Sequence, residues 1–294
     1  MNTTQVDSSP TTGPWLDSAE LLLLGAIWGS SFLFMRIAAP EFGAMPVAFL
    51  RVLFGALILL PLLIKTRTQF PRTIWPKLFV IGAINTALPF VLFAWASARA
   101  PAGVSSIANA MTVLFTALAA VLFFGQTMTF KRVLALLLGF AGVVVLALDK
   151  TEGASIGWPV AAGVLAAASY GLGINLVKRQ FSELPTGGVA CATLLTSAIL
   201  LFPFALAQWP DHAVSPTSWG AILALGIVCS GIAYVLYYRL IKRIGPSRAS
   251  TVTYLIPLFA VTWAWMFLGE PLSLYMAIAC GTILLSVFIS QSNN

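Results

Sequence analysis

Charged residues are scarce in this sequence, and histidine is nearly absent. Charged side chains make up 9% of the 294 residues, against about 25% in soluble domains. The one histidine, His212, cannot supply an HExxH zinc site, and no GxxxxGK(S/T) phosphate-binding loop occurs. A rhomboid-type serine protease needs a histidine at membrane depth, whereas His212 falls in an expected loop. An intramembrane enzyme and ATP-driven chemistry are therefore disfavoured.

Cysteine and redox motifs are also sparse. Cys191, Cys229 and Cys280 each lie inside an apolar stretch, and no CxxC pair occurs. Small apolar packing residues are the favoured interpretation, so neither a metal nor another cofactor is expected. The net charge of +7 comes from cations between the apolar stretches, not from a basic patch. Nucleic acid is therefore not an expected partner.

Hydrophobic residues dominate what is present. They form 59% of the chain, and the mean hydropathy is +0.94. Ten apolar stretches of about 18–23 residues are each long enough to cross a bilayer as a helix. The sequence therefore predicts an all-α integral membrane protein with the lipid bilayer as its surroundings. The stretches fall at residues 18–38, 44–64, 76–97, 102–124, 131–148, 156–177, 187–208, 217–238, 247–268 and 272–290.

The chain repeats itself with a spacing of 142–144 positions. Trp28 and Gly29 recur as Tyr170 and Gly171, and similar pairs follow along both halves. Each half holds five stretches, so an odd count makes the second half enter the membrane from the other side. We expect a disordered cytoplasmic tail at 1–17, five-helix repeats at 18–150 and 151–290, and a short tail at 291–294.

Lysine and arginine fall on one side of this expected topology. Twelve lie in loops on the side of the termini and three on the other, which predicts that both termini are cytoplasmic. The twelve are Lys65, Arg67, Arg72, Lys77, Lys131, Arg132, Lys178, Arg179, Arg239, Lys242, Arg243 and Arg248, and the three are Arg36, Arg99 and Lys150.

Two charged residues bear on function. Arg51 lies about seven residues into the second stretch, where a charge is costly. It either binds a substrate carboxylate with its guanidinium or has a structural role at a helix contact. Glu270 begins a turn after the ninth stretch and has a structural or a gating role. No acidic residue lies at mid-depth, which favours facilitated transport or coupling through an unidentified group.

Neutral polar and aromatic residues recur in equivalent stretches of the two halves. Ser105, Asn109 and Thr112 follow i, i+4, i+7 and so share one helix face. Such residues also mediate helix packing, but their recurrence predicts a shared, largely apolar cavity. Pro89 and Pro257 lie inside stretches as hinges or static kinks. The predicted cavity residues are Trp28, Ser31, Asn85, Pro89, Trp95, Ser105, Asn109, Met111, Thr112, Tyr170, Asn175, Ser230, Tyr234, Tyr237, Thr253, Tyr254 and Pro257.

These residues resemble the drug/metabolite transporter superfamily, in particular its ten-span exporters built from two EamA repeats. The resemblance covers residues 18–290, and the first half has Gln126 where the second has Glu270. Among these exporters, the chain is most similar to those of aromatic amino acids. The resemblance implies a central cavity built from spans 1, 3, 4, 6, 8 and 9, with spans 5 and 10 at the periphery. It is carried by Trp28-Gly29-Ser30-Ser31-Phe32, Arg51, Gly139 with Gly142, and Gly269-Glu270-Pro271-Leu272.

The first hypothesis is an exporter of aromatic and other neutral amino acids in the bacterial inner membrane, working by alternating access. A carrier of drugs or other small metabolites is the alternative, and an intramembrane enzyme or a channel is more distant. A monomer suffices for this mechanism, although the sequence does not determine the oligomeric state.

Overall fold

The first half of the chain forms five membrane-crossing segments. The computed structural model describes residues 14–291, except 128 and 152–153. The second segment continues through two short 3₁₀ turns, η1 (Arg67–Gln69) and η2 (Arg72–Ile74), into the third. The helices are α1 (Pro14–Phe42), α2 (Ala44–Lys65), α3 (Trp75–Gly82), the π-helix η3 (Ala83–Ala87), α4 (Leu88–Ser97), α5 (Ala102–Ala110), α6 (Thr112–Phe124) and α7 (Phe130–Ala147).

The second half repeats this arrangement after a two-residue antiparallel pair, β1 (Lys150–Thr151) with β2 (Ala154–Ser155). Within the described residues, eight helical segments are long and apolar enough to span a membrane, and two shorter apolar helices complete a set of ten. The helices are α8 (Gly157–Phe181), α9 (Thr186–Ala207), α10 (Pro216–Leu223), the π-helix η4 (Ala224–Ile232), α11 (Ala233–Ile244), α12 (Pro246–Ala249), α13 (Val252–Leu268) and α14 (Leu274–Gln291).

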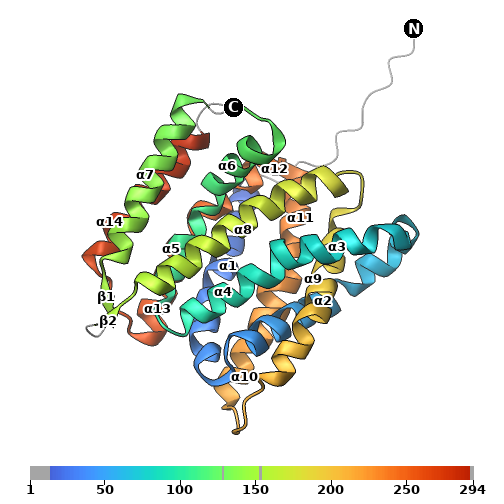
Figure 1. The fold of residues 1–294 in the computed structure, drawn as a ribbon, viewed down its shortest axis with the longest axis horizontal. Coiled ribbons are helices and arrows are strands. Elements are labelled where there is room, and N and C mark those ends of the chain that lie inside the picture. Colours follow the sequence, from blue (N-terminus) through green and yellow to red (C-terminus); the bar gives the residue numbers. More distant parts are fainter. Residues whose placement is uncertain (1–13, 128, 152–153, 292–294) are drawn as a thin grey trace.

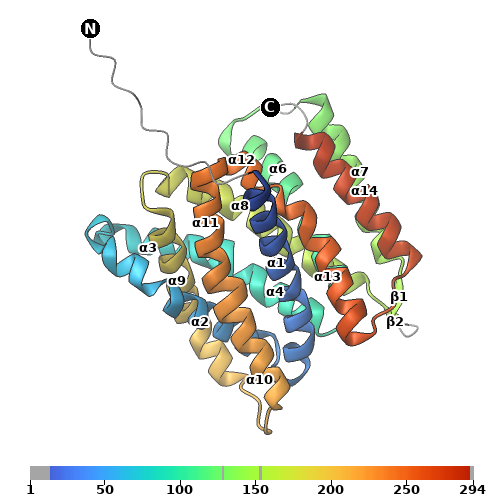
Figure 2. The ribbon, with the colours of Figure 1, turned by 180° about the vertical axis from the view of Figure 1, so that it is seen from behind.

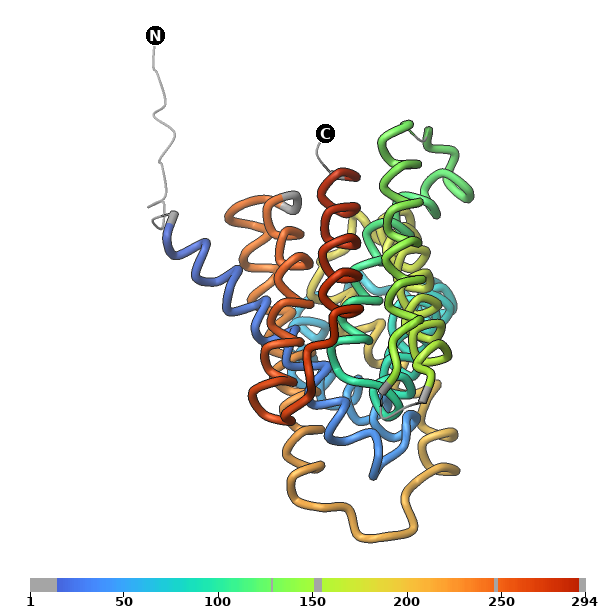
Figure 3. The backbone as a smooth tube through the Cα atoms, turned by 90° about the vertical axis from the view of Figure 1, so that its left-hand side faces the viewer, coloured from blue at the N-terminus to red at the C-terminus, as the bar shows by residue number. Residues whose placement is uncertain are grey.

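The protein is an all-α membrane protein of two inverted five-helix repeats, as the sequence predicts. Helix α1 begins and α14 ends on the same face, which we call the terminal face (Figure 2). The loop before α10 lies on the other face, which we call the opposite face (Figures 1 and 3). Helices α7 and α14 pack side by side at one edge of the bundle (Figure 1), as the resemblance implies.

The two halves repeat local features that hydropathy alone does not reveal. The third and eighth spans each contain a π-helix, η3 and η4. The fourth span is interrupted at Met111 and the ninth at residues 250–251, and both end at a glycine in the left-handed region, Gly125 with φ 69° and Gly269 with φ 65°. A positive φ favours glycine because it has no Cβ to clash. The duplication therefore extends to backbone geometry.

Equivalent glycines allow two pairs of helices to pack closely. A Cβ on Gly29 of α1 would lie 2.6 Å from the Phe259 Cβ and 2.9 Å from the Ala260 backbone nitrogen of α13. A Cβ on Gly171 of α8 would lie 2.6 Å from the Phe115 carbonyl carbon of α6. Small residues permit such backbone approach between helices in membranes. These contacts fix the walls between which the cavity forms.

The tail predicted at residues 1–17 is wrong for residues 14–17, which are helical. Helix α1 begins at Pro14, and the Asp17 carboxylate accepts a hydrogen bond of 2.5 Å from Arg243 Nε of α11. Proline is tolerated in a first helical turn, and the ion pair fixes the next one. Helix α14 also continues to Gln291, one residue beyond its predicted end. Residues 1–13 and 292–294 lie outside the described part of the chain.

Candidate functional site

A cavity of about 220 Å³ lies where the two halves meet. Eight of the predicted cavity residues line it, from five of the ten spans, and Arg51 adds the second span. The eight are Trp28, Ser31, Asn109, Thr112, Tyr170, Tyr234, Tyr237 and Thr253. The sequence did not identify seven other lining residues, which are Phe32, Met35, Phe90, Phe93, Ile174, Cys229 and Ile256.

A helical spacing signal does point to several of the missed residues. Trp28, Ser31, Phe32 and Met35 follow i, i+3, i+4, i+7 on α1, which is one helix face. Phe32 and Met35 are apolar, so a pattern of polar residues does not include them, although they lie on the same helix face as Ser31. Extending each polar position by three or four residues along its helix would have recovered them.

Aromatic side chains form two walls of the cavity. The Trp28 ring meets the Tyr237 ring edge-on with centroids 5.0 Å apart, and it meets Tyr234 at 6.3 Å. On the other wall Tyr170 stacks against Phe93 at 6.1 Å and packs edge-on against Phe90 at 6.2 Å. Such ring pairs are rigid and present both an apolar surface and polar edges. The cavity therefore suits a small cargo with an apolar or aromatic part.

Trp28 is held in place by its indole nitrogen. Its Nε1–H donates to the backbone carbonyl of Cys229 in η4 at 3.2 Å. The Cys229 thiol in turn donates to the Ile27 carbonyl at 3.2 Å. These contacts join α1 to the π-helix of the other half, so the tryptophan ring is fixed before any cargo arrives.

Arg51 is the one charged residue among the described residues lining this cavity. It is buried, with 7% of its surface exposed, and its Nε–H donates to Ser230 Oγ at 3.0 Å. Its guanidinium carbon lies 3.7 Å from the centroid of the Phe90 ring, which is a cation–π contact. The described part of the chain supplies it with no carboxylate partner. The cavity therefore carries one positive charge that the lining does not balance.

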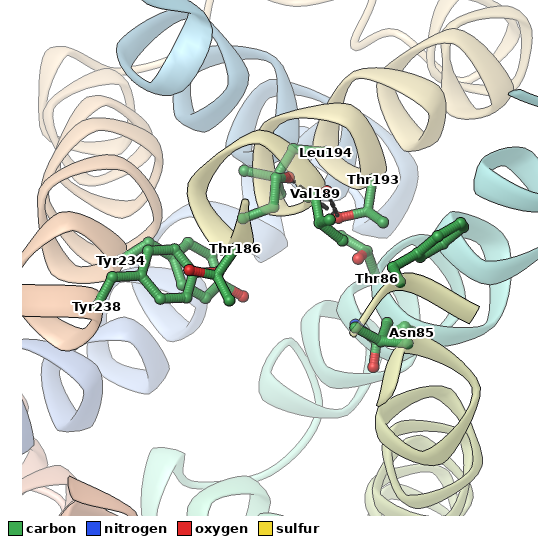
Figure 4. A pocket seen from close by; sticks show the side chains of 11 residues that line it. Asn85, Thr86, Thr186, Val189, Thr193, Leu194, Tyr234 and Tyr238 are labelled. Atoms are coloured by element: carbon green, nitrogen blue, oxygen red, sulfur yellow. Dashed lines mark hydrogen bonds between the residues drawn. The ribbon is translucent and has the colours of Figure 1, made fainter. Parts of the chain in front are cut away.

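Two further cavities lie between this site and the terminal face, each sharing lining residues with the next. A second cavity of about 100 Å³, lined by Asn85 and Thr193 among others, shares Tyr234 with the central one (Figure 4). In Figure 4, Tyr234 and Tyr238 reach from α11 toward Thr186 at the start of α9. A third cavity of about 480 Å³ shares Thr186 and Tyr238 with the second. The lining residues thus lead from the centre toward the terminal face.

An ion pair on the opposite face, which we call the latch, joins residues of the two halves. Glu270 Oε1 accepts from Arg36 Nε at 2.9 Å, and Glu270 Oε2 accepts from the Ala102 backbone N–H at 2.9 Å. Arg36 Nη1 also donates to the carbonyls of Ser97 and Ala98, each at 3.2 Å. The latch joins α1 and the turn after α13 to the hairpin between α4 and α5. This geometry favours a role for Glu270 in linking spans over a role in its own turn alone.

Three predicted cavity residues lie beside the central cavity. Asn85 lines the second cavity, and its buried Oδ1 has no hydrogen-bond partner among the described residues. Ser230 is fully buried and accepts the hydrogen bond from Arg51. Asn175 donates through Nδ2 to a carbonyl of α6 and to one of α8, each at 2.9 Å, so it joins two helices.

Three further residues face other parts of the protein. Ser105 is fully buried and pairs with Ser97 at 3.3 Å between hydroxyl oxygens. Met111 is fully buried in the cluster to which α5, α6, α7 and α14 contribute. Trp95 packs under the Arg99 guanidinium, 4.2 Å from the ring centroid. None of these three residues lines the central cavity in this conformation.

The remaining three predicted cavity residues also lie off the lining. Pro89 is buried in the first turn of α4, directly after the π-helix η3. A proline in a first turn is tolerated although it lacks an N–H donor. Pro257 is buried inside α13. Tyr254 is partly buried against the cluster that contains Met111. None of them lines the central cavity in this conformation.

The fold and the cavity define a class, a multi-span α-helical membrane protein with a central cavity between its two halves. The chain belongs to the EamA-like transporter family, within the drug/metabolite transporter superfamily, because the family model matches residues 19–148 and again residues 157–291.

Individual relatives agree with this class. The chain is 24% identical over 254 residues to a probable terminal-alkyne amino-acid exporter of Streptantibioticus cattleyicolor, covering 85% of this chain and 84% of the relative. It is 26% identical to protein PecM of Dickeya dadantii, covering 84% and 82%. It is also 26% identical to the uncharacterized inner membrane transporter YedA of Escherichia coli, covering 92% and 88%.

A solved structure shares the fold. One crystal structure superposes with a TM-score of 0.61 at 19% identity, covering 94% of this chain and 97% of the other. The family model and the relatives confirm the predicted superfamily, while the aromatic amino acid specificity stays a prediction.

Proposed function

We propose that this protein exports neutral amino acids with apolar or aromatic side chains, and related small metabolites, by alternating access. The observation that carries the proposal is the central cavity, with aromatic walls, one cation and no lining carboxylate. Its volume of about 220 Å³ is below the roughly 300–1,000 Å³ of pockets for drug-sized ligands. An amino acid fits this size better than a drug. The relative named as an amino-acid exporter agrees with this cargo class.

The proposed direction of export rests on the two faces. Twelve lysines and arginines lie in helix ends and connections toward the terminal face and three toward the opposite face, so we place the terminal face in the cytoplasm of a bacterial cell. Cargo then enters from the cytoplasm along the connected cavities while the latch closes the outer side. Opening the latch and closing the inner route completes the cycle.

The test is counterflow in proteoliposomes of the purified full-length protein. Vesicles are preloaded with phenylalanine, methionine, threonine, lysine or glutamate, and uptake of labelled phenylalanine is followed. We expect stimulation by phenylalanine and methionine but not by lysine or glutamate. We also expect no dependence on a pH gradient, because no described acidic residue lines the cavity. Absence of stimulation by every amino acid in folded protein would refute the proposal in favour of a drug or other metabolite carrier.

A pair of tryptophan variants links this activity to the cavity. Trp28→Ala removes a ring from the cavity wall and should raise the KM for phenylalanine several-fold. Trp158→Ala removes a ring that is 80% exposed at the start of α8 and should leave the KM unchanged. Equal effects of the two substitutions would place the transport site elsewhere.

A further inference from the structure

Arg51 has donors that the protein does not use. A guanidinium carries five N–H donors. The Nε–H binds Ser230 Oγ at 3.0 Å, and Nη1 contacts only the Met35 sulfur, a weak acceptor, at 3.7 Å. No hydrogen bond to Nη2 is present in the described part of the chain. Buried charges are normally paired because water no longer stabilises them. A buried guanidinium with unpaired donors at a cavity wall is therefore suited to an anionic ligand.

Arg36 shows what a structural arginine looks like in the same fold. Its donors bind two backbone carbonyls and the Glu270 carboxylate. The described contacts of Arg51 include neither a carbonyl nor a carboxylate. Its orientation is nevertheless fixed, because Phe90 covers the guanidinium face and Ser230 holds Nε. The side chain is preorganised with its remaining edge unoccupied, which lowers the entropy cost of binding.

The charges around the cavity point to one class of group. Because the described lining contains Arg51 as its one charge and no carboxylate, an ammonium group meets no opposite charge there. The planar guanidinium matches the two oxygens of a carboxylate. We infer that Arg51 binds the carboxylate of the cargo and that the cavity selects for a carboxylate instead of an amino group. This inference rests on the proposal that the central cavity is the transport site. Monocarboxylates without an amino group are then cargo as well.

Competition among phenylalanine analogues tests the inference with the unaltered protein. Counterflow of labelled phenylalanine is measured in the presence of 3-phenylpropionate, which lacks the amino group, or of phenethylamine or phenylalaninamide, which lack the carboxylate. We expect 3-phenylpropionate to inhibit within about tenfold of phenylalanine itself. The two compounds without a carboxylate should be at least about 30-fold weaker, since a buried charge is then left unpaired. Inhibition by phenethylamine as strong as by 3-phenylpropionate would overturn the inference.

Three arginine variants then assign the effect to Arg51. Arg51→Gln should weaken 3-phenylpropionate by about 30-fold and abolish the preference for it over phenethylamine. Arg51→Lys keeps the charge but not the planar fork and should fall between the two. Arg99→Gln is the matched control, because Arg99 is exposed and contacts Trp95. A preference that survives in folded Arg51→Gln protein would overturn the inference.

The two proposals fail separately. If no amino acid supports counterflow, the proposed function is wrong, and thermal stabilisation of the purified protein by the same compounds still tests Arg51. Stabilisation by 3-phenylpropionate but not by phenethylamine would then support a carboxylate site with another cargo. Stabilisation by both, or by neither, would overturn the Arg51 inference.

Discussion

Replacing Glu270 with glutamine should release the opposite face of the protein. The carboxylate accepts from Arg36 Nε and from the Ala102 N–H, each at 2.9 Å. Glutamine keeps the size and one acceptor, but its amide nitrogen must face one of these two donors. The side chains of Arg36 and Glu270 are 28% and 13% exposed, so the pair lies between a surface pair and a buried one. We therefore assign its loss about 2 kcal/mol, or about a 30-fold shift toward the state open to the opposite face.

A thiol placed under the latch reports this shift. Ser97→Cys introduces a small change at a fully buried position whose carbonyl contacts the latch. Native Cys191, Cys229 and Cys280 are replaced by alanine, and transport by this background is verified. A membrane-impermeant maleimide is applied to intact cells, with inside-out vesicles as the control for orientation. The rate of labelling then follows the fraction of molecules open to the opposite face.

The expected result is a labelling rate about ten- to thirtyfold higher with Glu270→Gln than without it. Glu183→Gln is the matched control, since Glu183 is an exposed acid in the turn after α8 and should change nothing. An unchanged rate in the Glu270 variant would show that the ion pair does not hold the opposite face closed. An equal rise in both variants would indicate a general charge effect.

Three further substitutions test other contacts. Gly171→Ala brings a Cβ within 2.6 and 2.7 Å of α6 backbone atoms, so overpacking should cost about 1–3 kcal/mol and lower the melting temperature. The control Gly281→Ala adds a Cβ with no atom within 4 Å and should leave the melting temperature unchanged. Trp28→Phe keeps a ring but loses the indole donor to η4, and should cost about 1 kcal/mol in thermal unfolding. Glu20→Gln removes one of the two carboxylates that pair with Arg243 near the terminal face, and also the partner of Arg239, so it should lower the melting temperature slightly. The decrease should vanish in high salt, and a decrease that persists would contradict a screened ion pair.

Features that depend on short stretches of sequence could be predicted. The ten spans agree with hydropathy to within several residues, because a helix in lipid needs about 20 apolar residues in succession. The shared polar face of Asn109 and Thr112 was also predictable, because helical spacing fixes which side chains point together. Hydropathy did not reveal that Met35 and Phe93 line the cavity, because the hydropathy of an apolar residue is the same whether its side chain faces cargo, lipid or another helix.

Features that join distant segments could not be predicted. Glu270 and its partner Arg36 are 234 positions apart, and neither residue alone shows that the other neutralises it. For Arg51 the sequence left open a structural role and a carboxylate contact. The choice between them depends on its donors, its aromatic neighbour and the lack of a described carboxylate, all of which are properties of the folded protein. Met111 packs in a cluster with residues of α7 and α14, and this contact between distant segments is not visible in the sequence around it.

The matching π-helices bear on the ancestry of the protein. A π segment closes i→i+5 hydrogen bonds and so holds an extra residue within its turn. Because η3 and η4 occupy corresponding spans, the simplest history has one insertion that was present before the gene duplicated. The ancestral five-span polypeptide then already had the widened turn. Two copies inserted in opposite orientations would have enclosed the same kind of cavity as an antiparallel dimer.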